Sequence, residues 1–137
     1  MCALTLVLVL AACQGVQLLT DQPLSIRFES WGDNMPTIGG PTATTSAGEV
    51  TVSGVFTTPT PCYQFEGSAS LQARHLRMLI DARAVGEVCA TVIGRRQYRL
   101  TALGLARGPY SVSVHHRRFE GRDGQDSTVA ELSVNVP

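Results

Sequence analysis

Histidine and acidic side chains are the groups in this 137-residue chain that could support metal binding or acid–base chemistry. His115 and His116 are adjacent. Neighbouring side chains on a β-strand point to opposite faces, so the two rings cannot bind one ion together. His75 could approach one of them in the fold, but no carboxylate stands at a spacing typical of a metal site. The sequence therefore predicts no metal site.

A cluster of acidic residues near the C-terminus could suggest calcium binding. Glu120, Asp123 and Asp126 lie around two glycines, but they lack the regular Asp-x-Asp-x-Asp-Gly order of the best-known calcium loop. A polar hairpin turn explains their spacing more simply.

Several classes of enzyme site are missing from the sequence. There is no Gly-x-Ser-x-Gly nucleophile turn and no glycine-rich phosphate loop. The acidic residues are spread singly, so no carboxylate pair for glycoside chemistry stands out. The chain contains no lysine, which excludes Schiff-base chemistry. We therefore predict a protein that is not an enzyme, with no catalytic residues and no cofactor. A small enzyme remains a weaker alternative, and it would need a concave pocket near one of the histidines.

Arginine is the remaining residue type that could bind a ligand. All eleven basic residues are arginine, a pattern that genomic base bias explains before function does. The net charge is zero, but residues 74–122 hold ten arginines and three acidic residues, a local charge of +7. Six arginines are predicted on or beside adjacent strands: Arg77, Arg83, Arg95, Arg96, Arg99 and Arg107. Guanidinium groups bind phosphates and carboxylates in pairs of hydrogen bonds, so these residues could form a surface for an anionic glycan or glycolipid. The alternative is a set of solvated strand faces that neighbouring acidic strands neutralise. No nucleic-acid partner is predicted.

The N-terminal segment combines an apolar run with a small-residue ending. The run from Ala3 ends in Leu10-Ala11-Ala12-Cys13, which resembles the lipobox of bacterial lipoprotein precursors. The run is too short to span a membrane, which takes about 20 apolar residues. The chain departs from the lipoprotein pattern because no basic residue precedes Arg27, which suggests a true start codon further upstream.

The lipobox resemblance implies a cellular location and a processing step. Cleavage before Cys13 would remove residues 1–12 as a signal peptide and leave a lipid on Cys13, followed by a tether over residues 13–23 and a domain over residues 24–137. Gln14 is of the type that usually permits sorting to the outer membrane of a Gram-negative-type cell. The resemblance therefore implies a bacterial cell-envelope protein whose membrane partner is reached through the lipid.

The lipobox interpretation assigns a role to each of the four cysteines. Cys2 leaves with the signal, Cys13 takes the lipid, and Cys62 and Cys89 remain. In an oxidising compartment this last pair is predicted to form a disulfide. Neither cysteine lies in a Cys-x-x-Cys pair or near a histidine at ligand spacing, so metal and redox roles are less favoured.

The rest of the chain shows the alternation of half-buried strands and no helical period. Residues 32–48 are rich in Gly, Pro, Thr and Ser and predict a long loop. Strands are expected around residues 24–29, 50–56, 62–69, 76–83, 89–94, 98–102, 110–115 and 130–136. Short strands at this spacing indicate an all-β sandwich or barrel.

One local motif favours the sandwich. Leu105, Gly108 and Tyr110 stand directly before an alternating strand. They resemble the tyrosine corner of immunoglobulin-like and fibronectin-type sandwiches. The resemblance is strong over residues 96–116 and otherwise rests on strand rhythm. The chain departs from antibody domains because the separation of Cys62 and Cys89 is short and no tryptophan lies between them.

Together these patterns predict an all-β, immunoglobulin-like antiparallel sandwich of about seven strands, acting as a lipid-anchored, non-catalytic binding or accessory module. Its binding surface is expected at the loop of residues 32–48 and the arginine-bearing sheet, and its partner is an envelope protein or an anionic glycan or glycolipid. One alternative is an envelope inhibitor of a hydrolase, of the protease or lysozyme type, which needs one ordered protruding loop such as Thr57 to Pro61. The other alternative is a structural spacer, which predicts no cluster of exposed arginines on one face.

Overall fold

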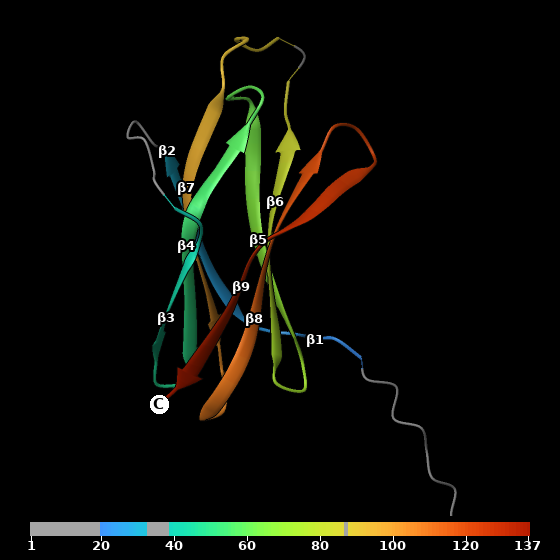
Figure 1. Ribbon diagram of the computed structural model, residues 1–137. Coiled ribbons are helices and arrows are strands. Elements are labelled where there is room, and N and C mark those ends of the chain that lie inside the picture. Colours follow the sequence, from blue (N-terminus) through green and yellow to red (C-terminus); the bar gives the residue numbers. More distant parts are fainter. Residues whose placement is uncertain (1–19, 33–38, 87) are drawn as a thin grey trace, which may run out of the picture.

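The protein is a sandwich of two β-sheets (Figure 1). The computed structural model describes residues 20–32, 39–86 and 88–137. Over these residues it contains nine strands and no helix. No helix among them is long and apolar enough to cross a membrane. Cys13 and the predicted signal peptide, residues 1–12, lie outside the described residues.

One sheet has five strands and the other has four. The five-stranded sheet has the order β1-β5-β6-β8-β9, with bounds β1 Gln22–Pro23, β5 Tyr63–Gln72, β6 His75–Ala84, β8 Gly108–Phe119 and β9 Gly124–Val136. The four-stranded sheet has the order β2-β7-β4-β3, with bounds β2 Ile26–Gly32, β7 Gly94–Leu103, β4 Glu49–Thr58 and β3 Thr42–Ser46.

The connections after β6 set the topology. The chain leaves β6, enters β7 in the opposite sheet, and returns to β8 beside β6. Because it crosses the sandwich twice, β8 runs parallel to β6, whereas every other strand pair is antiparallel. The predicted all-β sandwich is confirmed, but the described residues form nine strands instead of about seven, and one central pair is parallel.

Three sequence expectations about element boundaries need correction. The predicted loop of residues 32–48 contains β3, which pairs along β4. Residues 89–93 form no strand, and β7 begins at Gly94. The sheet also begins earlier than predicted, because Gln22 and Pro23 of β1 pair with Leu71 and Ser70 of β5, inside the expected tether. Composition alone could not separate a polar edge strand from a loop, because edge strands carry polar residues on both faces.

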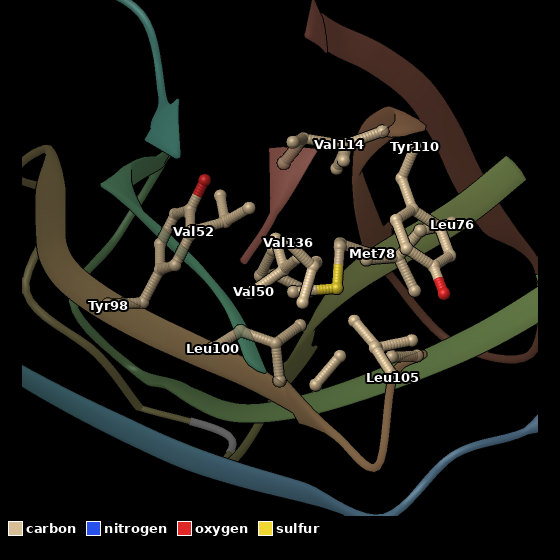
Figure 2. Close-up of a cluster of buried hydrophobic side chains, with 14 of the residues drawn as sticks. Val50, Val52, Leu76, Met78, Tyr98, Leu100, Leu105, Tyr110, Val114 and Val136 are labelled. Carbon is tan, nitrogen blue, oxygen red and sulfur yellow. The ribbon is translucent and has the colours of Figure 1, made fainter. Parts of the chain in front are cut away.

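The core lies between the two sheets, as the period-two alternation predicted. Figure 2 shows Val50, Val52 and Leu100 of the four-stranded sheet facing Leu76 and Met78 of the other sheet. All five side chains are fully buried. Burial of alternate side chains leaves the intervening residues of each strand on the outer faces, and these faces position the candidate sites.

A disulfide at one end of the sandwich and a tyrosine hydrogen bond at the other add contacts outside the strand pairing. Cys62 and Cys89 form the predicted disulfide, which joins the residue before β5 to the loop after β6. At the other end the hydroxyl of Tyr110 donates a hydrogen bond of 2.9 Å to the carbonyl oxygen of Ala106. Leu105 is buried beside it, and Gly108 adopts a φ of 127°. A φ of this sign strains residues with a Cβ, so glycine suits this corner.

Candidate functional site

The six arginines proposed as an anionic surface do not lie together. Arg77 and Arg83 are outward on β6 of the five-stranded sheet, whereas Arg95 and Arg99 are outward on β7 of the opposite sheet. Arg96 also lies on β7, with its guanidinium carbon 5.8 Å from the ring centroid of Phe65 in the opposite sheet. Arg107 lies in the exposed turn before β8. The expectation of one arginine-bearing sheet is therefore corrected, because strands β6 and β7 are neighbours in sequence but belong to different sheets.

On the outer face of the five-stranded sheet, arginine and histidine side chains contact carboxylates of the same face. Arg117 donates two hydrogen bonds to Asp81, of 2.8 and 2.7 Å. Asp126 accepts a hydrogen bond from Arg77 and lies 2.9 Å from Nδ1 of His115. Arg117, Arg77 and His115 therefore each have a carboxylate partner on another strand of the same sheet, so much of the arginine charge on this face is already paired.

His75 lies at one end of this face, between two serines. Its Nδ1 is 2.9 Å from Oγ of Ser111 and its Nε2 is 3.0 Å from Oγ of Ser113. The two serines therefore occupy both ring nitrogens, and none is left for the carboxylate that orients a catalytic histidine. An open hollow of about 510 Å³ adjoins His75, with Pro109, Tyr110 and Val134 in its lining. His75 therefore links β6 to the neighbouring β8 by hydrogen bonds, and its ring has no carboxylate partner of the kind found in a Ser-His-Asp triad.

His115 and His116 lie on opposite faces of β8, as strand geometry predicts. His115 points outward to Asp126, and His116 points inward, where its Nε2 is 2.9 Å from the hydroxyl of Tyr98. The His116 ring stacks on Phe56 with centroids 4.2 Å apart. Burial lowers the pKa of His116 to about 4 and raises the pKa of Tyr98. Within the described residues, no group of three His, Cys, Asp or Glu side chains could hold a metal ion.

The largest concentration of exposed apolar side chains lies in the loop between β6 and β7. We call residues 85–93 the apolar loop. Among the described residues, six large hydrophobic side chains are exposed, and four of them belong to this loop: Val85, Val88, Val92 and Ile93. Val88 is 94% exposed and Ile93 is 71% exposed, so most of the surface of both residues is uncovered within the described structure. Figure 1 shows the loop projecting beyond the ends of the strands.

The disulfide ties the middle of the apolar loop to the residue before β5. Cys89 is bonded to Cys62, and the backbone N–H of Val85 donates a hydrogen bond of 3.0 Å to the carbonyl oxygen of Cys62. In the turn before Cys62, Oγ1 of Thr58 donates a 2.7 Å hydrogen bond to the carbonyl oxygen of Thr60. Thr57 to Pro61, the segment expected as an inhibitory loop, therefore lies beside residues 85–93, which carry the exposed large apolar side chains at this end.

The apolar loop lies at the end of the sandwich opposite β1. Strand β1 pairs with Leu71 and Ser70, where β5 turns into β6, and the loop leaves the far end of β6 at Ala84. A ten-residue strand is about 33 Å long, which separates the loop from the N-terminal entry of the chain.

No protein-family profile, curated protein or solved structure matches this chain. Sequence reasoning missed the apolar loop because residues 89–93 are apolar and β-branched, which is the composition of a buried strand. The signal that could have identified it is Cys89 itself, since a disulfide at the start of such a run favours a loop held at the surface.

Proposed function

We propose that this protein is a non-catalytic binding module of the bacterial cell envelope, anchored by a lipid on Cys13, that binds a partner protein through the apolar loop. The observation that carries the proposal is the exposure of Val88, Val92 and Ile93 on one loop that a disulfide ties to the sandwich. Apolar side chains gathered at one exposed place mark interaction surfaces in soluble domains, whereas scattered ones need no explanation.

The disulfide makes the loop a suitable binding element. A loop that is tied to the sandwich by a disulfide loses less conformational entropy on binding than a free loop of the same length. Burial of one valine or isoleucine side chain contributes roughly 1.5–3 kcal/mol. Three such residues on a restrained loop are therefore sufficient for the apolar centre of a small interface.

The position of the loop favours a partner protein over the anchoring membrane. With a lipid on Cys13, the chain enters the sandwich at the β1 end, and the apolar loop lies at the opposite end of β6. The loop would then face away from the membrane that holds the anchor. The divided arginines give no single cationic surface for an anionic glycan or glycolipid, which agrees with the spacer alternative, but a pure spacer leaves the apolar loop unexplained.

Site-specific photo-crosslinking in the native host tests the loop. A photoreactive amino acid at position 88 should give one discrete protein adduct, and Ile93→Ser should abolish it. The matched control is position 129, since Val129 is also exposed but lies on β9. Equal adducts at positions 88 and 129, or an adduct that survives Ile93→Ser, would contradict the proposal.

Intact mass of the protein from native membranes tests the anchor independently. We expect a Cys13 N-terminus that carries two or three acyl chains, and a further mass increase of two hydrogens on reduction of the Cys62–Cys89 disulfide. An unlipidated chain that retains residues 1–12 would overturn the anchor and leave the loop proposal standing.

A second candidate function is inhibition of an envelope hydrolase. The observation that favours it is the projecting loop braced by a disulfide, because inhibitors bind enzyme clefts through pre-organised loops. If the adduct at position 88 is a hydrolase, the purified domain should inhibit it and Val88→Ser should weaken the inhibition. An adduct with a protein that is not a hydrolase would exclude this candidate.

A further inference from the structure

We infer that the outer face of the four-stranded sheet is a separate binding site for a neutral saccharide chain, with Trp31 as its stacking platform. This site lies on a different surface from the apolar loop and does not depend on it. Trp31 is the only tryptophan in the chain.

Trp31 lies near the end of β2 with its side chain on the outer face. Its register partner on β7 is Gln97, between the inward-facing Arg96 and Tyr98. Trp31 is 39% exposed, although tryptophan is the side chain with the largest apolar area to bury. The guanidinium carbon of Arg99 lies 5.7 Å from the centroid of the Trp31 ring. An aromatic ring exposed on a flat sheet can stack against the C–H face of a pyranose ring, because that face is apolar while the hydroxyls point sideways.

Four of the five charged side chains on the outer face of this sheet form two ion pairs. Arg27 donates two hydrogen bonds to Glu49, of 3.0 and 2.9 Å, and Arg99 lies 3.5 Å from Glu29. The side chains of Arg99 and Glu29 are nevertheless 54% and 65% exposed. The two pairs balance each other's charge, and Arg95, also outward on β7, leaves this face with a net charge of only +1. Exposed donors and acceptors of this kind suit a neutral, hydroxyl-rich ligand, because most of the arginine charge is already paired with glutamate.

Two adjoining hollows on this face share Arg99. One, of about 360 Å³, has Trp31, Thr42 and Val55 in its lining. The other, of about 280 Å³, has Arg27, Glu29 and Thr51 in its lining. Their volumes lie near the lower end of the range for small-molecule sites, roughly 300–1,000 Å³. Arg99 lies between an aromatic hollow and a polar one, so consecutive rings of an extended saccharide could occupy the two.

Tryptophan fluorescence reports directly on this site, because the chain has no other tryptophan. We would titrate the purified protein, with its disulfide intact, with cellohexaose and chitohexaose, and with oligogalacturonate as an anionic comparison. The expected result is a saturable blue shift with at least one neutral saccharide, with a dissociation constant below about 1 mM, that persists at high salt because a neutral ligand forms no ion pair that salt could screen.

Calorimetry with variants distinguishes the sheet face from the rest of the surface. Trp31→Ala should lower the affinity at least tenfold, and Trp31→Phe should retain part of it. Val129→Ser is the matched control, and it should bind as the unmodified domain does.

Three outcomes would overturn the inference. One is the absence of a saturable shift with either neutral probe at about 10 mM, a concentration that would detect even weak binding. Another is a preference for oligogalacturonate that high salt abolishes, which would indicate an anionic ligand. The third is unchanged binding by Trp31→Ala, which would place the site elsewhere. None of these outcomes bears on the crosslinking test of the apolar loop.

Discussion

At the scale of single residues, His116 is the titratable group most affected by the fold. Its ring lies between Phe56 and the hydroxyl of Tyr98, and burial lowers its pKa to about 4. The charged side chains at the mouth of the adjoining hollow are Arg118 and Asp126. The unfolded chain would bind a proton at His116 near pH 6.5, whereas the folded protein keeps this ring neutral until much lower pH.

This difference predicts that the protein loses stability in mild acid. Above about pH 6.5 the His116 ring is neutral in both the folded and the unfolded state, so it does not affect the free energy of unfolding. Between pH 6.5 and 4 the unfolded state binds a proton at His116 that the folded state does not, so the free energy of unfolding falls as pH falls. We expect a loss of about 2 kcal/mol between pH 7 and pH 5, at up to about 1.4 kcal/mol per pH unit. Urea denaturation at pH 7, 6 and 5 measures it. His116→Asn should flatten the slope, and an equal slope in both proteins would contradict the assignment.

The partly buried and the exposed ion pairs should contribute differently to the free energy of unfolding. Asp81 is 9% exposed and accepts both hydrogen bonds of Arg117, and this hydrogen bonding raises the pKa of Arg117. Asp81→Ala should lower the free energy of unfolding by roughly 2–3 kcal/mol, because it leaves a partly buried guanidinium unpaired. The control is Glu49→Ala, which breaks the exposed pair with Arg27 and should cost less than about 1 kcal/mol. Equal losses in urea denaturation would show that burial of the pair is unimportant.

At the scale of the elements, the close approach of the two sheets depends on a glycine in β5. A Cβ added at Gly67 would lie 2.5 Å from Cδ2 of Phe28 and 2.9 Å from Cδ1 of Leu100, both in the opposite sheet. Neither ring nor branched side chain can move far in a packed core, so Gly67 sets the local distance between the sheets.

Gly67→Ala should therefore destabilise the sandwich by about 1–3 kcal/mol, the usual cost of overpacking a core. Gly40→Ala serves as the control, because nothing lies within 4 Å of its added Cβ, and its stability should change little. Chemical denaturation of both variants gives the comparison. A Gly67→Ala domain as stable as the unmodified one would mean that the sheets can separate without cost.

At the scale of the whole molecule, the chain crosses between sheets and the disulfide closes one end. The β6 to β7 crossing carries the apolar loop, and the Cys62–Cys89 bond spans 27 residues and ties this crossing to the start of β5. The bond therefore stabilises the end of the sandwich where the proposed interface lies, and the fold reaches its full stability only in an oxidising compartment.

Removal of the bond by Cys62→Ser with Cys89→Ser should lower the free energy of unfolding by about 3.5 kcal/mol, from the entropy of the opened loop. For a domain of this size the melting temperature should fall by about 15 °C. Calorimetry of the double variant, and of the unmodified domain with reductant, should agree. A melting temperature that is unchanged in both would show that the rest of the fold already restrains the loop.

The sequence anticipated local structure more fully than long-range structure. Alternation correctly located the buried faces of β4, β6 and β7, and the leftover cysteines correctly indicated the disulfide. The loop of residues 32–48 concealed β3, because an edge strand of threonines and serines has the composition of a loop. Residues 89–93 had the composition of a strand but form the second half of the apolar loop, directly before β7.

What the sequence by itself determined is the all-β class, the pairing of Cys62 with Cys89, and which residues of each strand share a face. These follow from a period of two residues and from the chemistry of the side chains, which are local. Only the tertiary structure decided which strands are neighbours. It placed β6 and β7 in different sheets, which divided the arginines, exposed the apolar loop at the crossing, and brought Trp31 beside Arg99. The physical reason is that alternation orients the side chains of one strand, whereas pairing depends on contacts between segments far apart in the chain.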